Sequence, residues 1–374
     1  MACGMRAILF YCILLLFSSV ASAQGLVDAP QPGTQAHTSK VEQVNRGTVG
    51  IITGSITGTY ARIATDLSAV LDQGNELRVL PIIGKGSVQN ITDILFLRGI
   101  DVGIVQSDVL HYILETGTYP DIGNRISFIT KLYNEEIHIL TRADIKAVDD
   151  LRGKKVNFAN EGSGTYMTAS VVFKKLGIDV EITTHDYELA LEKLKTGEID
   201  ALFYVAGKPA PIFAAIKPEE SLQLLNVGLT PDLAETYLPG EFTTADYPGL
   251  IPPNQEVKTV SVGAVMAVFN WRKGNGRYNK IKRFVEAFFS HFDEFLQAPR
   301  HPKWQEVNLA ADVPGWKRFE PARVWLESHE GDEAKQVSEF KNFLKTSGQA
   351  TALSAEDQEE LFKRFLKWKE TRTQ

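Results

Sequence analysis

The sequence contains the same succession of parts twice, and this duplication limits the folds that the chain can adopt. In each copy a β-rich run leads through a Gly/Ser/Thr turn into a helical pattern, and a Gly-(x)-Ile-Asp approach precedes a later strand. The first copy turns at residues 54–60 (GSITGTY) and the second at residues 161–166 (EGSGTY). Strands that alternate with helices form mainly parallel sheets with right-handed crossovers. Two such units predict an α/β protein with two lobes.

Hydrophobic patterning sets the expected elements. The predicted strands are Thr48–Thr53, Leu77–Ile83, Asp101–Gln106, Ile137–Thr141, Lys155–Ala159, Val180–Thr184, Ala201–Val205 and Lys258–Phe269. Helical patterns start at Tyr60, Val88 and Tyr187, another helix follows the turn that ends at Tyr166, and helical periodicity returns over Asn279–Gln297. The predicted organisation is a signal peptide at 1–23, a flexible linker at 24–46, a first lobe at 47–140 to which 250–299 return, a second lobe at 141–249, and a helical C-terminal extension at 300–374.

The N-terminus has the layout of a secretory signal peptide. Arg6 precedes the apolar run Ala7–Phe17, and a small-residue stretch (SSVASA) ends at Ala23. A membrane anchor is the alternative, but a span needs about 20 apolar residues. Cleavage after Ala23 removes both cysteines, Cys3 and Cys12. We therefore expect an exported, periplasmic protein, without disulfides or thiol chemistry.

Gly/Ser/Thr turns at helix starts are candidate anion sites. Such turns offer unpaired N–H groups, hydroxyls and the positive end of the helix dipole, which suit a carboxylate, sulfonate or phosphate. Ordinary N-capping by Ser or Thr is the alternative. The turns contribute the following candidate ligand-binding residues: Thr53, Gly54, Ser55, Thr57, Gly58, Thr59, Tyr60, Lys85, Gly86, Ser87, Asn90, Glu161, Gly162, Ser163, Gly164 and Thr165.

Strand ends supply the other candidates, because ligands of open α/β sheets lie outside the carboxyl ends of the strands. These candidates are Gln106, Ser107, Tyr133 and Tyr204, and a core position is equally open for Tyr204. Two further pairs are expected to lie outside the site. Asp101 and Asp200 are equivalent structural residues of the two copies, and Glu135–Glu136 is solvated charge near the end of a strand.

Composition and motifs exclude several function classes. Lys and Arg total 40 against 46 Asp and Glu, a net charge of −6, whereas nucleic-acid binding needs a basic stripe. The glycine turns lack the spacing of a P-loop or a dinucleotide fingerprint, so no cofactor is expected. The seven histidines are scattered, so no metal site is expected either. No nucleophile elbow is present, which argues against an enzyme.

The ordered set of these motifs resembles a known family. The runs ITGSITGTYA (52–61), GSVQN (86–90), GID with VQSD (99–108), GSGT (162–165) and DALF (200–203) are similar to those of the TAXI family, the extracytoplasmic solute-binding subunits of TRAP transporters. The match covers about residues 47–271. The resemblance implies a two-lobed periplasmic-binding-protein-like fold of type II. It also implies a small carboxylate ligand, such as glutamate or 2-oxoglutarate, and delivery to an ion-gradient-driven membrane permease.

Some residues depart from the family pattern. Lys85 and Gln89 stand where the family usually has Gly and Glu, which makes the region more positive, and Tyr166 stands where a charged residue is frequent.

The tail beyond residue 300 has no match to the family. It carries Trp304, Trp316, Trp325 and Trp368. Its last helix, Glu356–Glu370, is expected to pack on the parent domain, and a partner-binding helix is the alternative. We expect a monomer. A periplasmic sensor or adaptor, or an exported enzyme on the same scaffold, remains an alternative.

Overall fold

The computed structural model describes residues 30–74 and 76–329. The chain divides into two units, Met1–Asn45 and Arg46–Gln374. The first unit contains most of helix α1 (Gln35–Arg46), which begins where the Thr34 hydroxyl accepts a hydrogen bond from the His37 amide. The structure therefore differs from the expected irregular linker, although α1 has no buried residue. The predicted signal peptide at 1–23 and the predicted helix Glu356–Glu370 lie outside the described residues.

The second unit is built on one mixed sheet with the strand order β2-β1-β3-β10-β4-β7-β5-β6. Its first part follows the first sequence copy. The elements there are β1 (Thr48–Ile52), α2 (Thr59–Leu71), β2 (Arg78–Ile82), α3 (Ser87–Phe96), β3 (Val102–Gln106), α4 (Val109–Glu115) and α5 (Ile122–Arg125). Strands β1, β2 and β3 are parallel, as the duplicated pattern predicts.

The second sequence copy forms the other end of the sheet. Its elements are a 3-10 turn (Val148–Leu151), β5 (Lys155–Asn157), α6 (Gly164–Leu176), β6 (Glu181–Thr183), α7 (Tyr187–Thr196), β7 (Ala201–Ala206), α8 (Pro211–Ala214), a 3-10 turn (Pro218–Glu220), β8 (Leu222–Leu224), α9 (Pro231–Ala234) and β9 (Leu238–Thr243). Strands β5, β6 and β7 are parallel. Helices α6 and α7 end at glycines with positive φ, Gly177 and Gly197.

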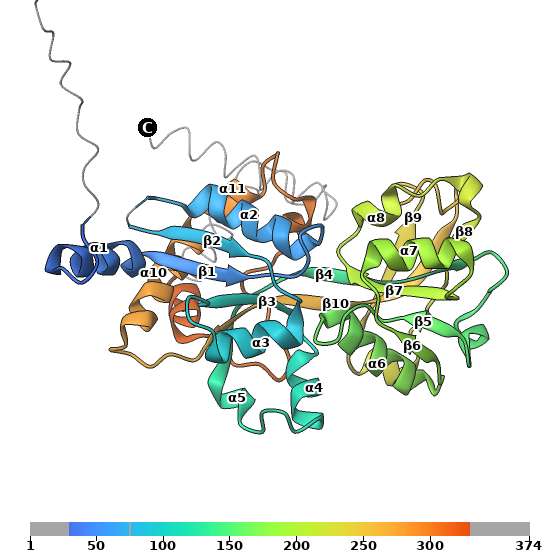
Figure 1. Ribbon diagram of the computed structural model, residues 1–374, viewed down its shortest axis with the longest axis horizontal. Helices are drawn as coiled ribbons and strands as arrows, with labels where there is room; N and C mark the ends of the chain where they lie inside the picture. The colour runs from blue at the N-terminus through green and yellow to red at the C-terminus, as the bar shows by residue number, and fades with distance from the viewer. Residues whose placement is uncertain (1–29, 75, 330–374) are drawn as a thin grey trace, which may run out of the picture. The chain divides into compact units, whose positions relative to one another are not determined.

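Two long antiparallel strands, β4 (Ile126–Arg142) and β10 (Glu256–Phe269), join the two parts of the sheet, and Figure 1 shows them passing together between those parts. The partners of β4 change at Glu136, which pairs with Ser261 of β10 and with Ala206 of β7. We call residues 46–135 with 263–329 the first lobe, and residues 136–262 the second lobe. In this two-lobed, mixed α/β fold both connecting strands contribute to both lobes.

The chain returns to the first lobe after β10. Helix α10 (Gly276–Ser290), helix α11 (Phe292–Phe295), a 3-10 turn (Pro302–Glu306) and helical residues 320–329 follow. Trp304, Phe319 and Ala322 lie in one buried cluster with Leu67 of α2 and Phe284 of α10. Residues 302–322 therefore pack into the core of the first lobe, within the stretch 300–374 for which a helical C-terminal extension is expected.

Most predicted strands agree with the structure to within a few residues, but one does not. The expected strand Ile137–Thr141 is the end of the 17-residue strand β4, whose residues are almost all buried. Because β4 has strand neighbours on both edges and packed layers on both faces, no alternation of polar and apolar residues marks its course.

Within the described residues, no helix has both the length and the apolar character needed to cross a membrane.

Candidate functional site

A cavity of about 140 Å³ lies where the carboxyl ends of the parallel strands of the two lobes face one another. Small-molecule sites occur preferentially at interfaces between domains. The first lobe lines it with Gly54, Ser55, Gly58, Thr59, Tyr60, Gly84, Lys85, Gly86, Gln106 and Glu135. The second lobe lines it with Ala159, Asn160, Ser163, Gly164, Thr165, Tyr187, Tyr204, Val205 and Ala206. The predicted turns of both sequence copies therefore meet in one place.

Helix α2 presents its N-terminus to the cavity without a side-chain cap. Its N-cap is Gly58, and among the described residues no side-chain hydrogen bond caps the helix. The Ser55 carbonyl accepts from the Gly58 amide and closes the turn. Amide groups left unpaired at a helix start, together with the helix dipole, favour a negatively charged group. At this turn the geometry thus fits anion binding better than ordinary capping.

Helix α6 begins differently, since Ser163 is a true N-cap. Its hydroxyl accepts a hydrogen bond from the Tyr166 amide at 3.1 Å. The next hydroxyl, Thr165 Oγ1, accepts from the Val205 amide at 3.2 Å and from the Tyr187 hydroxyl at 2.9 Å. Thr165 therefore fixes Tyr187 beside Tyr204, with ring centroids 4.1 Å apart. The α6 turn shapes the aromatic wall of the cavity.

The two lobes touch directly beside the cavity. The Gln89 amide of α3 donates to the Gly162 carbonyl at 3.1 Å, so this amide of α3 is already paired. A Cβ on Gly86 would lie 3.2 Å from the Gly164 nitrogen. A second contact between the lobes is made by Asp108, whose Oδ2 accepts from Thr168 Oγ1 at 3.0 Å and from the Tyr237 hydroxyl at 3.2 Å. The structure thus shows the lobes closed on one another.

Several predicted site residues do not line the cavity and are engaged elsewhere. The Thr53 hydroxyl donates to the Ile82 carbonyl, and the Asn90 amide group donates to the Ile104 carbonyl. The Ser87 hydroxyl donates to Gln106 Oε1 and accepts from the Gln106 amide, which orients that cavity residue. The Ser107 carbonyl accepts from the Trp316 indole. Hydrogen bonds of this kind hold the turns in place.

The remaining predicted residues outside the cavity lining differ in their exposure. Tyr133 is fully buried, and its hydroxyl has no hydrogen-bond partner among the described residues. Thr57 and Glu161 are exposed. Gly162 contributes its carbonyl to the lobe contact and has a φ of +83°, a conformation that glycine adopts most easily.

Glu135 is the most consequential cavity residue that the sequence analysis missed. It was expected to be solvated, but its exposed fraction is 2%, and its neighbour Glu136 is also buried. The Tyr60 hydroxyl donates to Glu135 Oε2 at 2.6 Å. Burial is the largest cause that raises the pKa of Glu135, to about 8, with Tyr60 and Lys303 opposing and Glu136 adding to the rise. The cavity lining therefore includes a buried carboxyl group that is hydrogen-bonded to Tyr60, in the first turn of α2.

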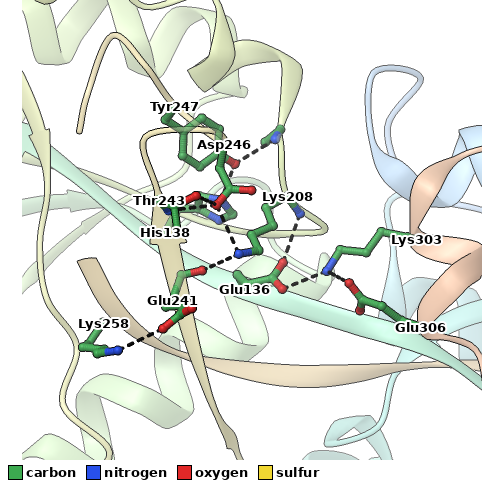
Figure 2. Close-up of polar contacts among 11 residues, drawn as sticks. Glu136, His138, Lys208, Glu241, Thr243, Asp246, Tyr247, Lys258, Lys303 and Glu306 are labelled. Carbon is green, nitrogen blue, oxygen red and sulfur yellow. Dashed lines mark hydrogen bonds and ion pairs between the residues drawn. The ribbon is translucent and has the colours of Figure 1, made fainter. Parts of the chain in front are cut away.

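Behind the cavity, Glu136 organises a buried ion-pair network at the level where β4 changes partners (Figure 2). Lys303 Nζ lies 2.8 Å from Glu136 Oε1 and 2.7 Å from Glu306 Oε1, with 3% of the lysine side chain exposed. Glu136 Oε2 accepts from the Lys208 amide at 3.0 Å. Both lobes are thereby tied to one carboxylate of a connecting strand.

His138 supports the same region from within the second lobe. Its Nδ1 lies 3.3 Å from the Tyr204 carbonyl, and its Nε2 lies 2.7 Å from the Tyr247 hydroxyl. Because a carbonyl only accepts, Nδ1 carries the proton and Nε2 accepts from Tyr247. Burial lowers the pKa of His138 to about 3, so the ring is neutral. This histidine holds the backbone of Tyr204, and it does not line the cavity.

No group of three or more His, Cys, Asp or Glu side chains among residues 30–74 and 76–329 is arranged to hold a metal ion. The residues that line the cavity include a single carboxyl side chain, that of Glu135, and no histidine.

Several solved structures are similar to this chain. "Structure of a periplasmic transporter" has a TM-score of 0.46 at 14% identity and covers 79% of this chain and 97% of its own. "Structure of periplasmic binding protein BugD" has a TM-score of 0.44 at 13% identity, covering 80% and 97%. "An ancestral arginine-binding protein bound to arginine" has a TM-score of 0.40 at 17% identity, covering 67% and 96%. The sequence profile of the NMT1-like family matches residues 51–311.

Proposed function

The chain belongs to the NMT1-like family, and from this premise and its cavity we propose that the protein is a periplasmic solute-binding receptor of the TAXI type. It captures a small carboxylate between its lobes and delivers it to an ion-gradient-driven TRAP permease. The motif resemblance over about residues 47–271 supports the TAXI assignment. The predicted signal peptide at 1–23 supports the location.

The observation that carries the proposal is the uncapped N-terminus of α2 inside a cavity lined by both lobes. The amides there attract an anion, and Lys85 lies at the exposed edge of the same lining. A ligand that contacts both lobes favours the closed arrangement over an open one, because only the closed form offers both sets of contacts. Direct contacts such as Gln89–Gly162 complete the enclosure.

A thermal-shift panel tests this function. The protein without residues 1–23 is purified, stripped of bound ligand by partial unfolding and refolding, and mixed with small carboxylates, sulfonates, phosphates and neutral analogues of similar size. A ligand that binds only the folded state raises the melting temperature with its concentration. We expect carboxylates to raise it and the neutral analogues to leave it unchanged. A panel without any shift contradicts a carboxylate receptor.

A substitution of Lys85, with a matched control, tests whether its charge contributes to carboxylate affinity. Lys85→Gln removes a charge at an exposed position, so the fold should keep its stability while carboxylate affinity falls several-fold. Lys282→Gln, on the exposed face of α10 away from the cavity lining, is the control and should bind as the unmodified protein does.

A further inference from the structure

Asp108 joins the two lobes at a place that is separate from the cavity lining. It follows the end of β3 in the first lobe, and its Oδ2 accepts from Thr168 Oγ1 of α6 at 3.0 Å and from the Tyr237 hydroxyl at 3.2 Å. Both donors belong to the second lobe, and none of the three residues lines the cavity. The two hydrogen bonds therefore depend on closure of the lobes and not on direct contact with a solute.

The position of Asp108 in its own helix does not explain these bonds. Asp108 is the N-cap of α4, where an aspartate is favoured because its carboxylate accepts from an amide of the first turn. Here its backbone is helical, with φ −76° and ψ −9°, and among the described residues no side-chain hydrogen bond caps α4. The carboxyl group is turned to the other lobe instead.

The surroundings of this carboxyl group disfavour its negative charge. Asp108 is 5% exposed, and its Oδ1 has no hydrogen-bond partner among the described residues. No ion pair of Asp108 is found in the same part of the chain. A buried carboxylate without a cation is costly, whereas the neutral acid is not. Parting of the lobes would remove Thr168 and Tyr237 and let water reach the group.

We infer that Asp108, Thr168 and Tyr237 form a latch between the lobes that closes more favourably when Asp108 carries a proton. A proton on Oδ1 leaves Oδ2 free to accept from both hydroxyl groups, so the neutral acid keeps the two bonds. We call these three residues the Asp108 latch. The latch needs two lobes that can part, and it depends neither on which solute the cavity holds nor on the TAXI assignment.

The ionisable groups around Asp108 set the direction of the effect. Burial is the largest cause that raises the pKa of Asp108, to about 6, and the two hydroxyl bonds and the charge of His111 on α4 oppose it. Glu135 of β4 and Asp108 disfavour each other's charge. Tyr237 contributes its hydroxyl, and α6 has no charged side chain before Lys174.

Protonation and closure are therefore linked. In an open form that water reaches, the pKa of Asp108 returns toward its ordinary value of 3.8. Because the pKa is higher in the closed form, that form binds the proton more tightly. A fall in pH through 6 then favours closure, and a rise through the same range disfavours it.

Energy transfer between two dyes measures the ratio of closed to open molecules without any solute. The protein lacking residues 1–23 has no cysteine, so dyes are attached at Arg98→Cys in the first lobe and Lys174→Cys in the second, both exposed positions. We expect the ratio to rise as the pH falls from 7 to 5. The rise should be about tenfold larger in the unmodified protein than in Asp108→Asn, because the closed and open forms differ in pKa.

Further variants decide between a latch and an ordinary structural contact. Asp144→Asn, at an exposed position, is the control and should respond to pH as the unmodified protein does. Tyr237→Phe keeps the ring and removes one donor to the carboxylate, so the midpoint of the pH response should move to a higher pH.

Two results overturn the inference. One is a closed-to-open ratio that does not change with pH in the unmodified protein, and the other is a change of equal size in Asp108→Asn. Should Asp108→Asn fail to fold, an unshifted midpoint in Tyr237→Phe overturns it instead. Because no ligand enters these measurements, a negative result leaves the proposed receptor function intact.

Discussion

Gly164 of the second lobe lies so close to Gln106 of the first that a Cβ on the glycine would be 1.9 Å from Gln106 Oε1 and 2.7 Å from Ser87 Oγ. Neither neighbour can easily move, because Ser87 and Gln106 hold each other through two hydrogen bonds. The closed contact between the lobes therefore requires a residue without a side chain at this position.

We predict that Gly164→Ala opens the lobes. A methyl group cannot be placed at 1.9 Å, so the variant should lose at least tenfold in ligand affinity and show a larger radius of gyration by small-angle X-ray scattering with ligand. Gly123→Ala is the control, since a Cβ on Gly123, in α5, meets no atom within 4 Å. A Gly164→Ala protein that binds and closes normally would contradict the steric requirement.

The raised pKa of Asp108 leads us to predict that the stability of the protein depends on pH. Burial is the main cause that raises its pKa to about 6 from an ordinary value of 3.8, against the bonds from Thr168 and Tyr237. An acid with a raised pKa binds its proton more tightly in the folded protein, so its contribution is most favourable below pH 4. That contribution falls as the pH rises from 4 to 6, by about 3 kcal/mol in total.

The variant Asp108→Asn isolates this effect. Urea unfolding at several pH values should show the variant gaining stability relative to the unmodified protein as the pH rises from 4 to 6, with a constant difference above about pH 7. Asp144→Asn, at an exposed position, should show no such trend. A difference that stays flat across this range would mean that Asp108 titrates normally.

The Glu136–Lys303 pair (Figure 2) predicts a large cost for removing one partner. Lys303→Met leaves Glu136 buried with the Lys208 amide as its remaining donor among the described residues, which should destabilise the protein by about 3–5 kcal/mol. The double variant Lys303→Met with Glu136→Gln should recover much of this loss. Lys282→Met, which breaks an exposed pair with Glu286, should cost under about 0.5 kcal/mol. Equal costs for both lysines would contradict the buried network.

The duplicated plan was predictable because it depends on local signals. Asp101 and Asp200, expected to be equivalent, do play the same part: Asp101 accepts from the Gly50 amide at 3.1 Å and Asp200 accepts from the Lys155 amide at 3.0 Å. Each also pairs with a basic residue, Lys280 or Arg142. Such contacts tie the start of a strand to its neighbour, and a repeated Gly-(x)-Ile-Asp sequence signals them.

Glu135 could not be located from the sequence, because its burial arises from distant segments. The run Asn134-Glu135-Glu136 is polar enough to suggest the surface, and only the pairing of β4 with β10, together with Lys303 and Tyr60, encloses it. Asn90 is the opposite case, a predicted site residue that does not line the cavity. It follows a promising glycine turn, yet its side chain holds the Ile104 carbonyl, a partner that no local pattern reveals.

The lobes meet where Glu136 of β4 pairs with Ser261 of β10, and this division of the chain implies an order in which the two lobes can be completed during synthesis. The second lobe is one uninterrupted stretch, so its chain is complete once β10 has emerged from the ribosome or crossed a membrane. The first lobe draws core residues from as far apart as Val49 and Ala322. The first lobe cannot complete its core until nearly the whole described chain has been synthesised. A truncation late in the sequence therefore removes core residues from the lobe whose chain begins first.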